Sequence, residues 1–188
     1  MNLVLEAIRS RRTIREFTDQ PVTPDVLRTI IEAATWAPNH RNAEPWRFIV
    51  LAKGGELREE VAEIVYDWTY DNARSQDAGH RADSANTAKQ EILDVPAFVY
   101  VYCVDGDNDE GTKENYAAVA CAIQNLMLAA QSLGIGVGWV TGRPCKADVG
   151  PALGAESNWQ IAGALYIGYP SVKLESERAP VDEVTSWR

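Results

Sequence analysis

The chain of 188 residues has the length of one domain and contains no linker or repeat, so we expect a single domain over residues 1–188. Its net charge of −9 argues against nucleic acid or an anionic membrane as the main partner. No run of eighteen apolar residues is present, and no basic and then apolar leader opens the sequence, so we expect neither a membrane span nor a secretory signal. Three widely spaced cysteines do not suit a disulfide framework and predict a cytoplasmic protein.

The first segment of the chain predicts two helices. Residues 2–10 place apolar side chains at helical spacing, and we expect Leu5 and Ile8 to contact the core. Residues 23–25 then have the order of an N-cap threonine, a proline at the first helical position and an acidic first turn. Pro38 ends this second predicted helix.

The middle of the chain alternates strands and helices. Residues 46–51 predict a strand and residues 56–70 a helix. The polar residues 71–88 predict a mobile surface segment that leads into a short helix ending near residues 95–96. Residues 97–104 are apolar almost throughout, which predicts a central strand.

The last third begins with the longest predicted helix, residues 115–133, which is apolar most of the way round. Such a helix is buried in the core or at a subunit interface. A glycine-rich strand over 136–142, a short helix over 147–153 and a strand over 161–167 follow. The last eighteen residues contain no convincing element, so this tail is either frayed or laid across a partner subunit.

The N-terminal quarter does not share the net negative charge of the rest of the chain. Residues 1–47 carry a net charge of +1 and the remainder −10, and four arginines lie within the first fifteen residues. Arginine has a planar fork of donors that matches phosphate oxygens two at a time. In this arrangement Arg11 and Thr13 can hold a terminal phosphate while Arg15 reaches further along the same ligand. The alternative is that these arginines form surface ion pairs of little energetic value.

A second segment, residues 37–46, has the pattern of a turn that presents polar groups. A proline ends the helix, Asn39, His40 and Asn42 are displayed on the turn, and a Glu-Pro-Trp sequence begins the next strand. Such a turn is well placed to offer backbone and side-chain groups to a planar ligand.

Other patterns do not indicate a site. The glycines of residues 134–138 follow a helix and open a strand, the reverse of a dinucleotide-binding fingerprint, and indicate close backbone approach to a ligand or a neighbouring helix. The aspartates of residues 105–109 lack the glycine and the final glutamate of a calcium loop. His40 and His80 have no ligands at metal spacing, and no nucleophile elbow is present, so we predict no metal site and no serine hydrolase.

Taken together, these segments resemble the FMN-dependent nitroreductase family, in its compact branch. The matching stretches keep the family's order and spacing over nearly the whole chain: Arg11-Arg12-Thr13-Ile14-Arg15-Glu16-Phe17, Ala37-Pro38-Asn39-His40-Arg41-Asn42-Ala43-Glu44-Pro45-Trp46, residues 115–139, Gly168-Tyr169-Pro170 and Arg178-Ala179-Pro180. The resemblance implies an α+β fold, an αβα sandwich with a mixed, mainly antiparallel sheet. It also implies a homodimer with a swapped C-terminal tail and two FMN molecules in the interface.

The resemblance further implies which residues contact the flavin. Arg11 and Arg178 would bind its phosphate, Thr13 the phosphate or the ribityl chain, and Arg15 the pyrimidine edge, with Arg12 also among the cofactor-binding residues. Four residues would arrive from the other subunit: Pro38, Asn39, His40 and Asn42. The backbone of Trp139, Val140 and Thr141 would run beside the ring, with the Thr141 N–H as a candidate donor to flavin N5.

The activity implied is that of an NAD(P)H oxidoreductase. NADPH or NADH would pass hydride to flavin N5, and a nitroaromatic, a quinone or a related small acceptor would then take the donor's place in a ping-pong cycle. No catalytic side chain is needed, although Arg15 would stabilise the anionic reduced flavin and Thr141 would support N5. Two alternatives stay open: a specialised flavin oxidase or dehydrogenase, and a flavin-binding storage or sensor protein with little turnover.

Overall fold

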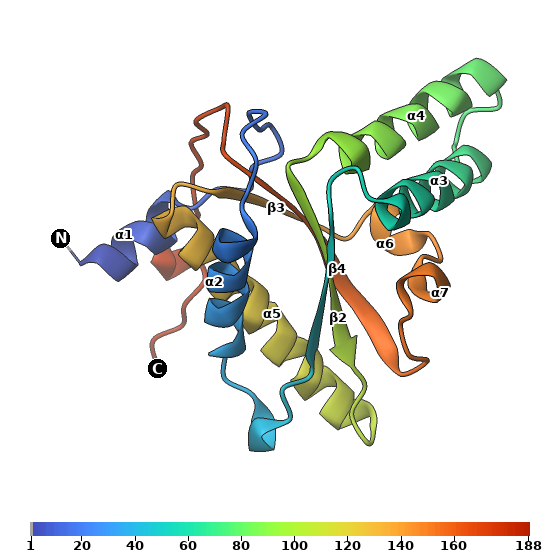
Figure 1. The fold of residues 1–188 in the computed structure, drawn as a ribbon. Coiled ribbons are helices and arrows are strands. Elements are labelled where there is room, and N and C mark those ends of the chain that lie inside the picture. Colours follow the sequence, from blue (N-terminus) through green and yellow to red (C-terminus); the bar gives the residue numbers. More distant parts are fainter. Residues whose placement is uncertain (1) are drawn as a thin grey trace.

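The computed structural model describes residues 2–188, in which helices cover both faces of one four-stranded sheet (Figure 1). The strands are β1 (Trp46–Leu51), β2 (Ala97–Val104), β3 (Gly136–Val140) and β4 (Trp159–Gly168). The helices are α1 (Leu3–Ser10), α2 (Pro24–Thr35), α3 (Glu56–Asp71), α4 (Ala78–Asp94), α5 (Asp109–Ser132), α6 (Arg143–Lys146) and α7 (Gly150–Leu153), with short 3₁₀ helices at His40–Asn42 and Val181–Glu183. The predicted α+β class and layered arrangement are confirmed.

The sheet has the order β1-β2-β4-β3, and its four strands pair antiparallel throughout. The parallel component is a single bridge between Thr13 and Val137, outside the named strands. β2 and β4 are the central strands, and β2 is buried over Ala97–Cys103 as its apolar sequence predicts. β3 therefore lies at an edge of the sheet, where one side of its backbone is open to other groups.

Alternation along the strands divides the interior into two layers. Val99 and Val101 point to the face covered by α2 and α5, whereas Phe98, Tyr100 and Tyr102 point to the face covered by α3 and α4. Alanines on α5 let this helix pack closely on the first face. The long helix α5 is thus largely a core element. It shares this core with β3, which lies beside it.

A buried arginine ties the α3–α4 hairpin to the sheet. Arg58 on α3 is 1% exposed, and its guanidinium donates to three backbone carbonyls. These belong to Ile92 at 2.8 Å, Leu51 at 3.5 Å and Val95. Burial lowers the pKa of Arg58 to about 10, while the nearby Asp94 acts in the opposite direction. The cation stays buried because carbonyl oxygens satisfy its donors.

Two sequence predictions need correction. Leu5 and Ile8 do not contact the core: their side chains are 49% and 48% exposed, and α1 buries no residue. Residues 71–88 are mostly helical, because Asp77 caps α4 by accepting from the His80 N–H at 2.9 Å. The Arg81 guanidinium fixes the start of α4 by stacking over the α3 residue Tyr70, 4.3 Å from its ring centroid.

Smaller differences concern helix boundaries. α5 begins at Asp109 rather than near residue 115, since the Asn108 side chain accepts from the Gly111 N–H and starts the helix earlier. Of the helix predicted over 147–153, only residues 150–153 are helical, as α7, and a separate short helix, α6, precedes the predicted range. Among residues 2–188, no helix is long and apolar enough to cross a membrane.

The buried phenols and thiols predict that alkaline pH destabilises the fold. Burial raises the pKa of Tyr102 and Cys145 to about 12, and that of Tyr100 further still. The unfolded chain releases these protons at lower pH than the folded chain does, so the free energy of unfolding falls as pH rises above about 9. Each fully buried group contributes up to about 1.4 kcal/mol per pH unit once its unfolded form is ionised.

Urea denaturation between pH 8 and 11 measures this dependence. Tyr100→Phe removes one of the titrating groups, together with the hydrogen bond that the hydroxyl donates to the Pro144 carbonyl at 3.0 Å. The variant should start less stable and lose stability less steeply with pH. Identical slopes for the two proteins would contradict the assignment.

Candidate functional site

The arginine-rich segment is an extended strand-like stretch that lies along the edge of β3. The Ile14 N–H donates to the Val137 carbonyl at 3.2 Å, and further along the Thr18 N–H donates to the Tyr169 carbonyl at 2.8 Å. Ile14 is buried, whereas the flanking Thr13 and Arg15 are exposed, as alternation in an extended chain requires. The backbone thus presents both polar side chains away from the core.

Glycines make this close approach possible. A Cβ at Gly138 would lie 2.5 Å from the Ile14 carbonyl oxygen, and one at Gly136 would lie 2.8 Å from the Ile14 Cβ. Gly168 has the same relation to the Phe17 ring, with 2.8 Å to its nearest atom. The glycines of β3 therefore serve close backbone approach, as predicted, although the approaching group is the arginine segment rather than a helix.

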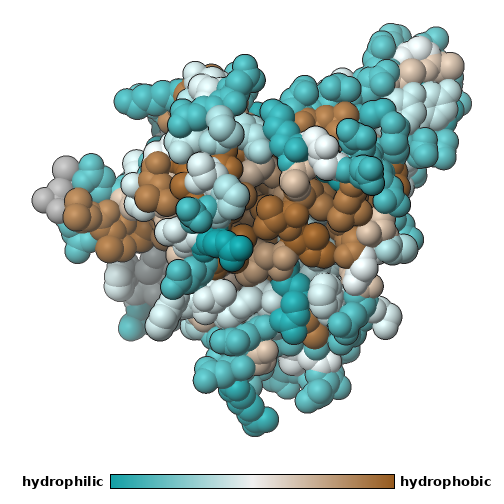
Figure 2. Space-filling model, in the orientation of Figure 1, coloured by the Kyte–Doolittle hydropathy of each residue, from teal (hydrophilic) through white to brown (hydrophobic). Residues whose placement is uncertain are grey.

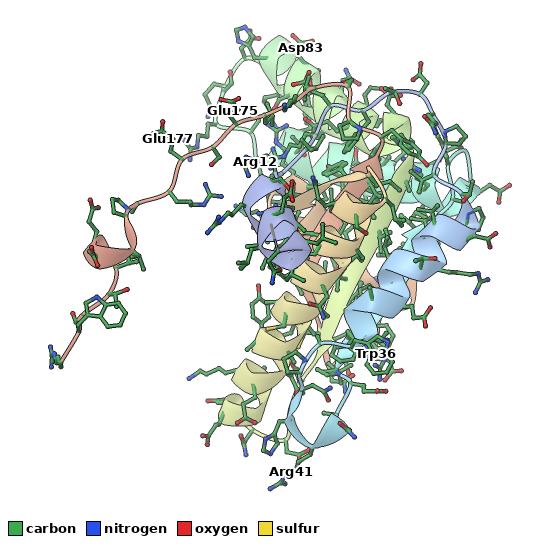
Figure 3. All side chains as sticks on the ribbon, turned by 90° about the vertical axis from the view of Figure 1, so that its left-hand side faces the viewer. Arg12, Trp36, Arg41, Asp83, Glu175 and Glu177 are labelled. Atoms are coloured by element: carbon green, nitrogen blue, oxygen red, sulfur yellow. The ribbon has the colours of Figure 1, made fainter. Side chains whose placement is uncertain are left out.

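Arg11, Arg12 and Arg178 form a cluster of like charges, which we call the arginine cluster. The pKa of Arg11 is lowered, first by burial and then by the positive charges of Arg178 and Arg12. Figure 3 shows Arg12 beside the C-terminal segment that carries Glu175 and Glu177. The two ends of the chain therefore meet here, as the resemblance implies.

The cluster has donors that the protein does not satisfy. Arg11 Nε and Nη1 and Arg12 Nε are buried and have no hydrogen-bond partner. Arg12 Nη1 donates to the Arg9 carbonyl at 2.6 Å, and Arg178 Nη1 donates to the Glu177 carbonyl at 2.7 Å, so these two arginines are also held in place. Within residues 2–188, every side-chain ion pair lies between residues 63 and 89 and none involves this cluster.

Such an arrangement is unfavourable without a counter-charge. Buried donors without acceptors cost free energy, and three adjacent cations repel one another. An anion with several acceptor oxygens would accept from the buried donors and would neutralise the adjacent cations. Arginine forks bind phosphate oxygens in pairs. The arginine cluster is therefore a candidate phosphate site, and the exposed Thr13 hydroxyl lies next to it in sequence.

The far half of β3 offers backbone groups to a ligand. In an antiparallel strand the N–H and C=O of alternate residues point to the same side. Because Val137 bonds outward to Ile14, Trp139 directs its backbone groups to the same open edge, and Thr141 follows just beyond the end of β3. The Trp139 indole itself turns back, donating to the Ala162 carbonyl at 3.2 Å, and Val140 is buried.

A cavity of about 240 Å³ opens beside Arg15, between the extended segment and the end of α4. Tyr166 and Glu91 also line it. Burial raises the pKa of Tyr166, the Glu91 charge raises it further, and the Arg15 charge opposes this. The cavity therefore combines one cation, three carboxylates (Asp19, Glu91 and Asp94) and a neutral phenol. Sequence analysis missed Glu91 and Tyr166, since neither stands in a motif and only the fold brings them to Arg15.

The turn after α2 is held in an unusual backbone conformation. Arg41, Asn42 and Glu44 have φ values of 51°, 53° and 44°, in the left-handed region that only asparagine among these three adopts readily. The Asn39 side chain holds the turn by accepting from the Glu44 N–H at 3.0 Å. Strained turns of this kind are concentrated at functional sites.

The predicted site residues fall into two groups in one protomer. Figure 3 places Arg41 at the opposite end of the molecule from Arg12, so the turn that contains Pro38, Asn39, His40 and Asn42 does not reach its own arginine cluster. Contact with the site of a second subunit stays a prediction. Among residues 2–188, no group of three His, Cys, Asp or Glu side chains is placed to hold a metal ion.

Comparison with known proteins agrees with this geometry. The model of the nitroreductase family matches residues 8–169. The chain belongs to the nitroreductase family. It is 32% identical to "Putative NAD(P)H nitroreductase YfhC" of Bacillus subtilis over 96% of this chain and 91% of that one. It is 31% identical to the 5,6-dimethylbenzimidazole synthase of Rhodospirillum rubrum over 95% of this chain and 85% of that one.

A solved structure shows the same fold with a ligand. The nitroreductase with bound FMN from Bacteroides fragilis superposes with a TM-score of 0.78 at 25% identity, and each chain is covered over 100% of its length. The nitroreductase-like fold expected from the sequence is thus confirmed, and the sandwich described above is its layered core.

The close contact at Gly138 predicts a test of how the arginine segment is held. Gly138→Ala would push a methyl group into the Ile14 carbonyl, so we expect the free energy of unfolding to fall by about 1–3 kcal/mol. The matched control is Gly150→Ala, where the nearest atom to an added Cβ is 3.8 Å away. Chemical denaturation measures both, and equal stability of the two variants would contradict the proposed packing.

Proposed function

We propose that this chain is an FMN-dependent oxidoreductase that takes hydride from NADH or NADPH and passes it to a small acceptor, such as a nitroaromatic or a quinone. The observation that carries the proposal is the arginine cluster, whose buried donors have no partner in the protein. Membership of the nitroreductase family and the FMN-bound neighbour support this identity of the anion.

The residues present fit the phosphate of FMN. Arg11 and Arg12 have free buried donors, Arg178 adds a third positive charge, and Thr13 adds a hydroxyl on the adjacent exposed position. Each charge-assisted hydrogen bond contributes roughly 1.5–3 kcal/mol. Two or three such bonds would contribute roughly 3–9 kcal/mol to cofactor binding.

The same segment would orient the rest of the cofactor along β3. Arg15, two residues beyond Thr13, would bring its positive charge to the ring, where it would stabilise the negative charge of the reduced flavin. The backbone groups of Trp139 and Thr141 would border the ring, with the Thr141 N–H as the donor to N5. Bound flavin supplies the hydride chemistry, and the protein supplies position and electrostatic field.

We further propose that the active form is a homodimer. The apolar side of α1, formed by Leu3, Val4, Leu5 and Ile8, has no cover within the protomer, and Figure 2 shows it as an apolar area at the left of the molecule. A groove of about 830 Å³ between α2 and β1 is also largely apolar (Figure 2). The exposed Val184 and Trp187 near the C-terminus suit a tail that swaps onto such a surface of the partner.

In this dimer the strained turn of residues 38–44 would contact the flavin of the other subunit, and this contact would offset the cost of its backbone conformation. We place the enzyme in the cytoplasm, where its three free cysteines stay reduced.

The similarity to a 5,6-dimethylbenzimidazole synthase supports one second candidate, a specialised flavin oxidase or dehydrogenase that acts on a single acceptor.

Anaerobic mixing of the purified protein with NADH or NADPH tests the proposal. A yellow, dimeric protein whose flavin absorbance bleaches rapidly is expected, since an accessible ring face permits hydride transfer. A flavin that stays oxidised would favour a storage or sensor protein, and a colourless protein that takes up no FMN would refute flavin binding altogether. If bleaching occurs, a screen of acceptors separates a broad reductase from a specialised enzyme.

A further inference from the structure

A second group of cations lies at the other end of β3 from the arginine cluster. Arg74, Arg143 and Lys146 line a cavity of about 540 Å³ between the α3–α4 connection and α6, with His80 on the same wall. We call it the α6 cavity. No aspartate or glutamate is among its lining residues in the described chain, although the protein as a whole carries a net charge of −9. Its volume is within the range of small-molecule sites.

The cations of the α6 cavity are not neutralised by the protein. Within residues 2–188, Arg74 and Lys146 make neither an ion pair nor a side-chain hydrogen bond. Arg143 donates only to the Ser84 carbonyl, at 3.4 Å. The α3–α4 connection carries one carboxylate, Asp77. It lies 3.6 Å from the His80 ring nitrogen Nδ1 and caps α4.

The wall of the cavity also contains a polar group without a partner. Thr69 is 4% exposed, and its hydroxyl makes no hydrogen bond in the protein. Leaving a buried hydroxyl unpaired costs free energy, so such groups are rare outside functional sites. Trp68, the preceding residue on α3, adds a broad aromatic surface to the same wall. A ligand with acceptor oxygens and a flat ring matches these features.

The position of the cavity relates it to the flavin. Gly142 and Arg143, which line the cavity, follow shortly after β3 ends at Val140. Figure 1 shows β3 running from the side of α1 towards α6. The arginine cluster and the α6 cavity thus lie at the two ends of the strand that would border the ring. A molecule placed over the ring can extend into the α6 cavity without competing for the phosphate site of FMN.

We infer that the α6 cavity binds the 2′-phosphate of NADPH and makes NADPH the preferred electron donor, an inference that rests on the proposed function. A phosphomonoester carries close to two negative charges, which Arg74, Arg143 and Lys146 would neutralise. Its oxygens would also accept from the Thr69 hydroxyl, and adenine would stack on Trp68. NADH has a hydroxyl in place of this phosphate and leaves the cations unpaired.

The FMN-loaded protein and two variants, Arg74→Ala and Lys146→Ala, test this assignment. Apparent Kd values for NADPH and NADH come from anaerobic flavin reduction. In the wild type we expect NADPH to bind at least about tenfold more tightly than NADH, since a charge-assisted hydrogen bond is worth that factor or more. Each variant should reduce the NADPH-to-NADH preference by about tenfold. Lys113→Ala, which removes an exposed lysine on α5 outside the cavity, is the matched control and should keep the wild-type preference.

Calorimetric titration with 2′-AMP, 5′-AMP and inorganic phosphate gives a readout without turnover. Tighter binding of 2′-AMP than of the other two, lost in Arg74→Ala, supports the inference. Equal binding of 2′-AMP and inorganic phosphate would show a simple anion site and overturn the donor assignment, as would equal use of NADPH and NADH. A flavin that neither donor reduces would refute the proposed enzyme, whereas the calorimetry would still decide for or against the cavity.

Discussion

Electrostatic repulsion among Arg11, Arg12 and Arg178 is the constraint on which this account depends. The repulsion and the buried, unpartnered donors of Arg11 and Arg12 act against folding in the absence of a counter-charge. A main-chain hydrogen bond to the Val137 carbonyl holds the arginine-rich segment in place against this repulsion. Glycines let the backbone of the segment lie against β3. Stability is thus given up to keep a positive site open, which natural proteins do chiefly where a ligand binds.

Two further features are incomplete in the isolated protomer. The apolar side of α1 is exposed although helices of this kind fold by burying such a face, and the turn at Arg41 has a strained backbone. The proposed homodimer would account for both features, with a second copy that covers α1 and receives the turn. In that dimer the cofactor site, the strained turn and the apolar surface would depend on one another.

The sequence predicted the fold and singled out one part of the candidate site. The predicted strand at residues 46–51 has those bounds in the structure, and residue type and spacing alone marked the Arg11–Arg15 segment as a candidate phosphate site. Only the end of helix α4 was predicted, because its first half is mostly polar, and its stability comes from Ala85, Ala88 and the Arg81–Tyr70 stack against α3. Periodicity predicted which side of α1 is apolar, but it carries no information on whether that side is covered within the protomer or by a partner.

The candidate residues that sequence analysis did not find share one property, which is that only tertiary contacts bring them to a cavity. Glu91 and Tyr166 meet Arg15 only through the packing of α4 on the sheet, and the Thr69 hydroxyl is notable only because it is buried without a partner. Arg178, in contrast, is 167 positions from Arg11 in the printed sequence and was assigned through resemblance alone. Its positive charge acts on Arg11 in the structure, which places both in one cluster.

A comparison of FMN with riboflavin is the most direct measurement of the central claim, since the two ligands have the same ring and ribityl chain and differ only in the phosphate. Flavin fluorescence quenching on addition of the flavin-free protein gives both dissociation constants. The arginine cluster predicts that FMN binds at least about 100-fold more tightly than riboflavin, and that this advantage shrinks as salt is added. Equal affinity for the two flavins would contradict the account.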